Sequence, residues 1–343
     1  MARPHGLLRA GYPYLRTLGM RRITNFPADI AFSKTEDVAY VLCRSEGASL
    51  IRIWPLEDME QQSDDLKQIG SYGTDDGQFQ WPVQIITNDA GDIFVSDEAL
   101  NRITKYNSDG EFVSKWGTEG SGDGQFNGPT GIAFNSVGNM VVVDSKNHRI
   151  QEYTADGEYV GGFGSYGSEP GQMDLPWGIH IDEFDDIYVT DWGNNRFQVF
   201  SRNGDLKNVV GSAGSGEGEF NRPTGIAVDD HGDIYVADCF NDRVEMFNAE
   251  GHYISSFRGD ASLSRVARTY MLTNAISNRL RETGRIEQEK YLRRPRSVRI
   301  DSEFRLFIPD YETYRIQIYQ KDFIRLDETQ FAAPLRNPTL EVT

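Results

Sequence analysis

The sequence predicts an all-β protein, a six-bladed β-propeller with a short helical insertion between blades five and six. A proline recurs every 47 residues, at Pro82, Pro129, Pro176 and Pro223. Each proline opens a short apolar run, and a second apolar run that ends in aspartate follows it. Repeats of this length, built from short β-runs, are typical of propeller blades.

Two weaker copies flank the four clear repeats and bring the count to six. Pro27 opens PADIAF and is followed by VAYVLC, where Cys43 stands in place of the aspartate. Pro295 opens PRSVRI and is followed by RLFIPD. The interval from Pro223 to Pro295 is 72 residues, 25 longer than the repeat, so an insertion is expected there.

Each unit is expected to hold four strands. In the third blade these are residues 131–135, 140–144, 149–153 and 159–163, separated by turns that contain glycine. Val, Ile, Tyr and Phe fill the runs, as the half-buried surface of a sheet prefers. Three positions before each clear proline lies a large apolar residue that is expected to pack between blades: Phe79, Phe126, Met173 and Phe220.

The expected organisation is a single propeller over residues 1–323, with a helical insertion at 260–294 and a C-terminal tail at 324–343. The sixth repeat lacks a clear fourth strand after Tyr319. We expect residues 14–19 to supply this strand, and residues 323–327 are the alternative. Closing the ring removes sheet edges that would otherwise invite aggregation.

The net charge of −17 disfavours nucleic acid and anionic membranes as partners of the protein body. Residues 260–299 are the exception, since ten basic and four acidic residues give them a local charge of +6. Helical spacing from Leu263 to Leu280 predicts one helix, and a second is expected to begin near Arg285 after Gly284. The arginines of this insertion either clamp the acidic propeller or attract an acidic ligand.

Several expectations follow from what the sequence lacks. No long apolar segment indicates a membrane span or a secretory signal, so a cytoplasmic location is expected. The protein is also expected to be a monomer. Cys43 and Cys239 are expected to be buried and free. No P-loop, nucleophile elbow or dinucleotide fingerprint occurs in a strand–helix setting, and no cofactor is expected.

An aspartate at the end of the second strand and an arginine five residues later recur in five blades. A single catalytic site does not need five copies, so we interpret these residues as structural pairs across one turn. The pairs are Asp97 with Arg102, Asp144 with Arg149, Asp191 with Arg196, Asp238 with Arg243, and Asp310 with Arg315.

The residues that differ between blades indicate a binding surface. The aspartates of blades four to six are followed by Trp192, by Cys239 and Phe240, and by Tyr311. Strand direction alternates, so these aromatics and the insertion are expected on one rim. Exposed aromatics beside cations are typical of recognition surfaces. The prediction is a module that recognises a protein or a small acidic ligand there, unless the insertion covers the aromatics.

Three further candidates lie on the innermost strands. His180 and Arg299 stand where other blades have Ala31, Ile86, Ala133 and Ala227. They are either accommodated in the packing or reach the central channel and bind a ligand. Trp177, directly after Pro176, is the third candidate.

The units PTGIAVDDHGDIYVAD (223–238), NDRVEMF (241–247) and VVVDSKNHRIQEY (141–153) resemble NHL-repeat blades. The resemblance covers about residues 27–320. It implies a six-bladed propeller whose top surface often binds protein or RNA. RNA binding through the basic insertion is therefore a further alternative.

The segment FGSYGSEPGQMDLP (163–176) also resembles the lyase half of the peptide-amidating system. That resemblance implies a peptidylamidoglycolate lyase with His180 in its site, and zinc or calcium is expected only under this alternative. The lyase often places zinc-binding histidines directly after the opening prolines. Here those positions hold other residues: Ala28, Val83, Thr130, Trp177, Thr224 and Arg296.

Overall fold

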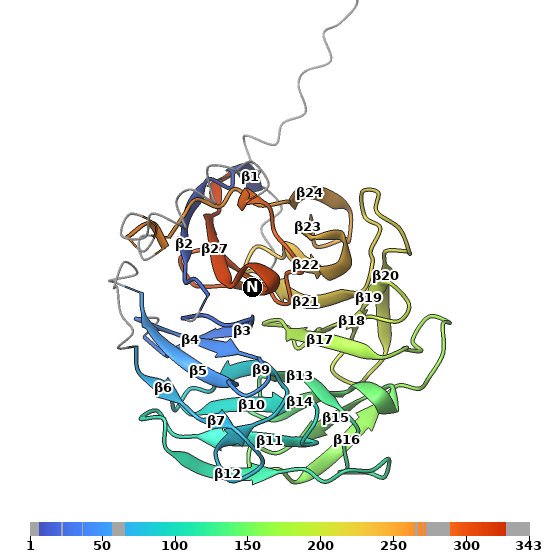
Figure 1. The fold of residues 1–343 in the computed structure, drawn as a ribbon. Coiled ribbons are helices and arrows are strands. Elements are labelled where there is room, and N and C mark those ends of the chain that lie inside the picture. The colour runs from blue at the N-terminus through green and yellow to red at the C-terminus, as the bar shows by residue number, and fades with distance from the viewer. Residues whose placement is uncertain are drawn as a thin grey trace, which may run out of the picture.

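The computed structural model describes residues 7–326, except residues 22, 36, 57–65, 265–266, 270 and 272–288. Within this part of the chain, six four-stranded antiparallel sheets follow one another around a centre (Figure 1). The prediction of an all-β, six-bladed propeller is thus confirmed. Residues 267–269 are helical, whereas the second helix expected near Arg285 lies outside the described residues.

The strands of each blade are lettered a to d from the centre outward. Blade one comprises β3 (Pro27–Phe32), β4 (Val38–Cys43), β5 (Leu50–Pro55) and β6 (Gln68–Ile69). Blade two comprises β9 (Pro82–Thr87), β10 (Ile93–Asp97), β11 (Arg102–Tyr106) and β12 (Phe112–Trp116). Blade three comprises β13 (Pro129–Phe134), β14 (Met140–Asp144), β15 (Arg149–Tyr153) and β16 (Tyr159–Phe163). Blade four comprises β17 (Pro176–Ile181), β18 (Ile187–Asp191), β19 (Arg196–Phe200) and β20 (Leu206–Val210). Blade five comprises β21 (Pro223–Val228), β22 (Ile234–Asp238), β23 (Arg243–Phe247) and β24 (Tyr253–Phe257). Blade six comprises β25 (Arg299–Ile300), β26 (Arg305–Asp310), β27 (Arg315–Gln320) and β2 (Tyr14–Leu18).

The interior of the propeller lies between neighbouring blades, where apolar residues of facing sheets meet. All five residues of β14 are buried, whereas none of the five residues of the outermost strand β16 is. The residues predicted to pack between blades do so. Phe126, for example, is fully buried among residues of blades two and three, and Phe79, Met173 and Phe220 occupy equivalent places.

The ring closes within blade six. Figure 1 shows the N-terminal strand β2 beside β27, and the two pair in antiparallel register from Tyr14 to Leu18. The alternative segment, which begins at Phe323, instead lies in β28 (Asp322–Arg325). That strand pairs with β1 (Leu7–Gly11) in a separate two-stranded sheet. Strands from near both ends of the chain thus hold blade six.

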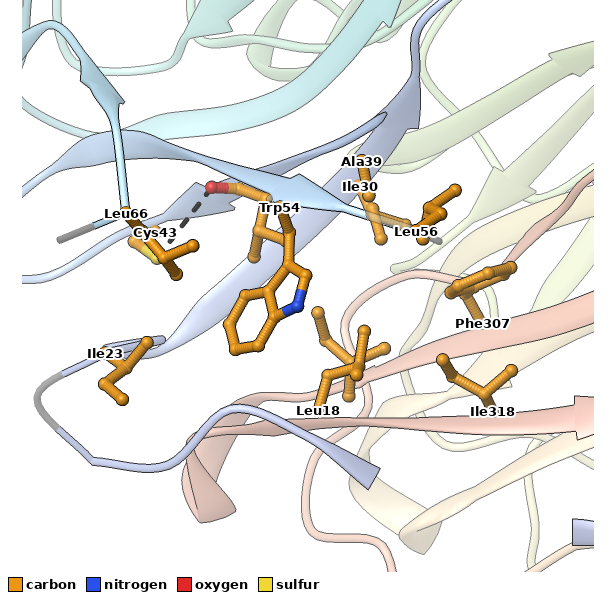
Figure 2. Packing of buried hydrophobic residues seen from close by; sticks show 12 residues of the cluster. Leu18, Ile23, Ile30, Ala39, Cys43, Trp54, Leu56, Leu66, Phe307 and Ile318 are labelled. Carbon is orange, nitrogen blue, oxygen red and sulfur yellow. Dashed lines mark hydrogen bonds between the residues drawn. The ribbon is translucent and has the colours of Figure 1, made fainter. Parts of the chain in front are cut away.

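Apolar packing also seals the junction between the sixth blade and the first (Figure 2). Trp54 of β5 is only 1% exposed and lies in the same cluster as Leu18 of β2 and Phe307 of β26. Residues separated by most of the chain therefore bury one another here, and burial of one large apolar side chain contributes roughly 1.5–3 kcal/mol. Cys43 belongs to this cluster, and both it and Cys239 are buried and free.

The repeated aspartates are completely buried, so their contacts do more than shape an exposed turn. In blade four, Asp191 accepts a hydrogen bond from Nε of Arg196 at 2.8 Å and another from the backbone of Asp174. Arg196 also donates to carbonyls of the incoming crossover. Blades three, five and six repeat this pattern.

The pairing expected between Asp97 and Arg102 in blade two is wrong in detail. The two residues are register partners, but Arg102 donates to the carbonyls of Thr74, Asp75 and Gln78. Asp97 instead accepts hydrogen bonds from four backbone N–H groups of its own blade. Blades three to five carry an asparagine three residues after the aspartate that also donates to it, and blade two has Leu100 there.

No helix in the part of the chain that the structure describes is both long and apolar enough to cross a membrane.

Candidate functional site

The predicted site residues divide between the two faces of the disc. The b–c face carries the b–c turns and the crossovers between blades, and the a–b face carries the a–b and c–d turns. Trp192, Phe240 and Tyr311 lie on the b–c face, directly after the b strands or in the turns that follow them. His180 and Arg299 lie toward the a–b ends of their a strands. The structure therefore brings the three aromatics to one face but does not bring His180 and Arg299 to them.

An arginine covers each of the three aromatic rings. The guanidinium carbon of Arg222 lies 4.1 Å from the centre of the Trp192 ring, a distance typical of a cation–π contact. Arg294 lies 4.8 Å from Phe240, and Arg296 lies 4.9 Å from Tyr311. We call these six residues the arginine–aromatic surface. A stacked guanidinium keeps N–H groups at its edge that can bind a carboxylate.

A fourth stack extends this chemistry around the same face. Arg44, directly after β4, lies 4.1 Å from the ring of Trp81, which directly precedes β9. Burial and the nearby charge of Arg296 lower the pKa of Arg44 to about 10, so it remains protonated at neutral pH. The buried Nε atoms of Arg44 and Arg296 have no hydrogen-bond acceptor among the described residues. Arg44 also lies 3.5 Å from Glu98, and Arg294 lies 3.1 Å from Glu312, so part of the positive charge on this face is paired with carboxylates.

Sequence reasoning predicted the aromatics and missed most of their cationic partners. Arg222 directly precedes Pro223, and Arg294 and Arg296 flank Pro295, so each stands beside a proline that opens a blade. Trp81 holds the same place before Pro82. A comparison of the positions flanking these prolines would have exposed the pattern.

Arg299 binds a carboxylate of another blade near the centre of the ring. Asp29 of blade one accepts two hydrogen bonds from Arg299 of blade six, at 3.0 Å from Nε and 2.6 Å from Nη2. Asp29 also accepts from Ser297 and from the backbone of Ile85. A cavity of about 20 Å³, room for about one water, lies here and is lined in part by Trp177. Arg299 is thus neutralised by a buried carboxylate and is not a free cation.

A much larger cavity, of about 500 Å³, opens on the a–b face. His180 and Arg299 lie in its lining, together with residues of the a–b turns of blades four, five and six. Burial, with a smaller effect of Arg299, lowers the pKa of His180 to about 4. His180 is therefore neutral at physiological pH.

The described residues do not fit the zinc site of the amidating lyase. None of the positions directly after the opening prolines is a histidine. Nowhere in the described ranges do three or more His, Cys, Asp or Glu residues come together as a group that could hold a metal ion. We therefore assign no step of that chemistry to this chain.

Two family models match the chain. One is described as a 6-bladed β-propeller and matches residues 179–332, and the other is the NHL repeat and matches residues 126–153. No curated protein matches the chain.

Solved structures share the fold at low identity. A streptogramin B lyase is 14% identical, with a TM-score of 0.55 over 94% of this chain and 90% of that one. A virginiamycin B lyase from Staphylococcus aureus is 12% identical, with a TM-score of 0.55 over 91% and 100%. A protein of unknown function from Bacteroides thetaiotaomicron is 14% identical, with a TM-score of 0.60 over 92% and 76%. At these identities the likeness concerns the fold alone. The six sheets identify the described chain as a six-bladed β-propeller, and one of its segments, residues 126–153, matches the NHL repeat.

Proposed function

We propose that this propeller is a binding module whose arginine–aromatic surface takes an acidic segment of a partner protein. The observation that carries the proposal is the stacking of an arginine on an aromatic ring in each of three successive blades. The rings supply apolar contact area, and the guanidinium edges supply donors for carboxylates. Tryptophan, tyrosine and arginine are also the residues most enriched at the energetic centres of protein interfaces.

The shape of this face favours a protein segment over a small ligand. The cavity beside it has room for about one water, so an organic acid would find no enclosing pocket there. The stacks instead lie side by side along the rim, with Phe240 43% exposed and Arg294 exposed beside it. An extended chain with several carboxylates can engage successive blades, which a single small anion cannot.

The first prediction concerns the charge of this surface. A fluorescein-labelled oligoglutamate peptide should bind the wild-type protein at low salt, and fluorescence anisotropy should show the binding weakening as salt is added. Replacing Arg222, Arg294 and Arg296 together with glutamine should weaken it at least about tenfold, because the paired carboxylates lose their donors.

A matched control removes the same charge elsewhere. The triple variant Lys115→Gln, Arg202→Gln, Lys207→Gln changes exposed cations outside the b–c face and should leave binding unchanged. If both triple variants lost the same affinity for the peptide, the effect would come from net charge alone, and the proposed site would be rejected. Oligoglutamine binding as tightly as oligoglutamate would reject an acidic partner.

A second prediction tests what the aromatic rings contribute to binding, apart from the arginines. Replacing Trp192 and Phe240 together with alanine should abolish capture of the same peptide while leaving the melting temperature close to wild type. Full binding by this variant would show that the aromatics serve only as supports within the fold. Metal analysis of the same preparations tests the lyase alternative, which requires bound zinc.

A further inference from the structure

We propose that the large cavity on the a–b face is a second binding site, for a small organic cation with an apolar body. The site is distinct from the arginine–aromatic surface because it lies on the opposite face and carries the opposite charge. Its volume of about 500 Å³ falls within the range of small-molecule sites in proteins.

Part of the cavity wall is apolar, and these apolar residues come from several blades. Phe32 of β3, Ile86 of β9, Ile181 of β17 and Ile300 of β25 all line it. These side chains are partly buried, and all of them line the cavity. A ligand with an aromatic or aliphatic body would remove this apolar surface from water, which is the main favourable term in such sites.

The charge of the lining selects a cation. Five carboxylates line the cavity against one guanidinium, and that guanidinium, of Arg299, is already held by Asp29. Two of the five carboxylates are also compensated, because Asp229 is paired with Lys321 and Asp301 with Arg305. Glu183 and Asp230 are exposed at the mouth and form no ion pair with a described residue. An anionic ligand would meet uncompensated negative charge, whereas a protonated amine would neutralise it.

His180 supplies a neutral polar group in the same cavity. Its lowered pKa keeps the imidazole uncharged, so one ring nitrogen can accept a hydrogen bond and the other can donate one. No hydrogen bond to either ring nitrogen occurs among the described residues, although the ring lies 6.4 Å from that of Tyr188 in an edge contact. Alanine or isoleucine occupies this position in blades one, two, three and five, so blade four alone places an imidazole here.

Three probes with one aromatic body and different charges test the proposal on the full chain. Benzylamine, benzyl alcohol and benzoate are titrated into protein carrying ¹³C-labelled isoleucine methyl groups and histidine rings. Benzylamine should shift the signals of Ile86, Ile181 and His180 saturably, benzyl alcohol should do so more weakly, and benzoate least of all.

Charge-removing variants then locate the cation. The double variant Glu183→Gln, Asp230→Asn should weaken benzylamine binding about fivefold and leave benzyl alcohol unchanged. The matched control Asp156→Asn, Glu158→Gln removes two exposed carboxylates from the c–d turn of blade three and should have no effect. Benzoate binding as tightly as benzylamine, shifts confined to other residues, or equal behaviour of the two double variants would overturn the proposal. So would the absence of any saturable shift.

Discussion

Replacing Lys321 with methionine should lower the free energy of unfolding by about 3–5 kcal/mol, the usual cost of removing one partner from a buried ion pair. Lys321 is completely buried, and its Nζ lies 2.5 Å from Asp229, 2.8 Å from Asp233 and 3.1 Å from Nδ1 of His231. Methionine matches the length of the side chain but leaves two buried carboxylates without their shared cation.

The position of this cluster explains why the effect should be large. Asp229 and Asp233 belong to the a–b turn of blade five, whereas Lys321 joins β27 to β28 near the end of the described chain. Arg9 of β1 also donates to Asp233. One ionic cluster thus ties both terminal strands to a neighbouring blade, and its loss weakens the closure of the ring.

A lysine in a similar pair at the surface provides the control. Lys207 pairs with Asp186 but is 48% exposed, so Lys207→Met should change stability by no more than about 1 kcal/mol. Chemical denaturation of both variants measures the difference. The double variant Lys321→Met, Asp229→Asn should recover part of the loss, because it removes one of the abandoned charges. If Lys321→Met were as stable as Lys207→Met, the cluster would not stabilise the fold.

The fold was predictable because the sequence contains several copies of the blade pattern. Four prolines at a constant interval fixed the a strands, and the aspartate and arginine fixed the b–c turn of each blade. Comparison of copies also showed where a blade departs from the rest, which is how Trp192 and His180 were found. Repetition therefore served both as evidence for the fold and as the background against which candidate sites stood out.

Contacts between blades were not predictable in the same way. The stack of Arg222 on Trp192 joins the start of one blade to the b–c turn of the previous one, so it depends on how neighbouring sheets are placed. The cluster around Lys321 lies beyond the last repeat, where no second copy exists for comparison. The separation of His180 from Trp192 on opposite faces follows from their positions along the strands, since one lies near the end of an a strand and the other follows a b strand.

Blade five departs from the pattern of the other blades at Glu245, and this difference predicts a pH dependence of stability. The third residue of strand c is Gln151, Gln198 and Gln317 in blades three, four and six. Each glutamine donates a hydrogen bond from its amide to the buried aspartate of its own blade, at 3.0–3.2 Å. Blade five has Glu245 in this place, completely buried beside Asp238.

An ionised Glu245 cannot make the hydrogen bond that the glutamines make. The pKa of its carboxyl is raised to about 7. Burial is the main cause, Arg243 at 3.0 Å opposes it, and the charge of Asp238 adds to it. In the unfolded chain the ordinary value is 4.5. Between these two values the folded protein keeps a proton that the unfolded chain has released. The stability that the protonated Glu245 contributes is therefore fully present below pH 4.5 and is lost as the pH rises to about 7.

Glu245→Gln should remove this loss. A difference of 2.5 between the two pKa values corresponds to at most roughly 3 kcal/mol, so the variant should be more stable than wild type by up to that amount at pH 8 and nearly equal to it at pH 4. The reverse change in blade four, Gln198→Glu, should introduce a similar dependence, since Gln198 occupies the same position beside Asp191. Denaturation of the three proteins across this pH range measures both effects. A constant difference between wild type and Glu245→Gln at all pH values would show that Glu245 does not take up a proton on folding.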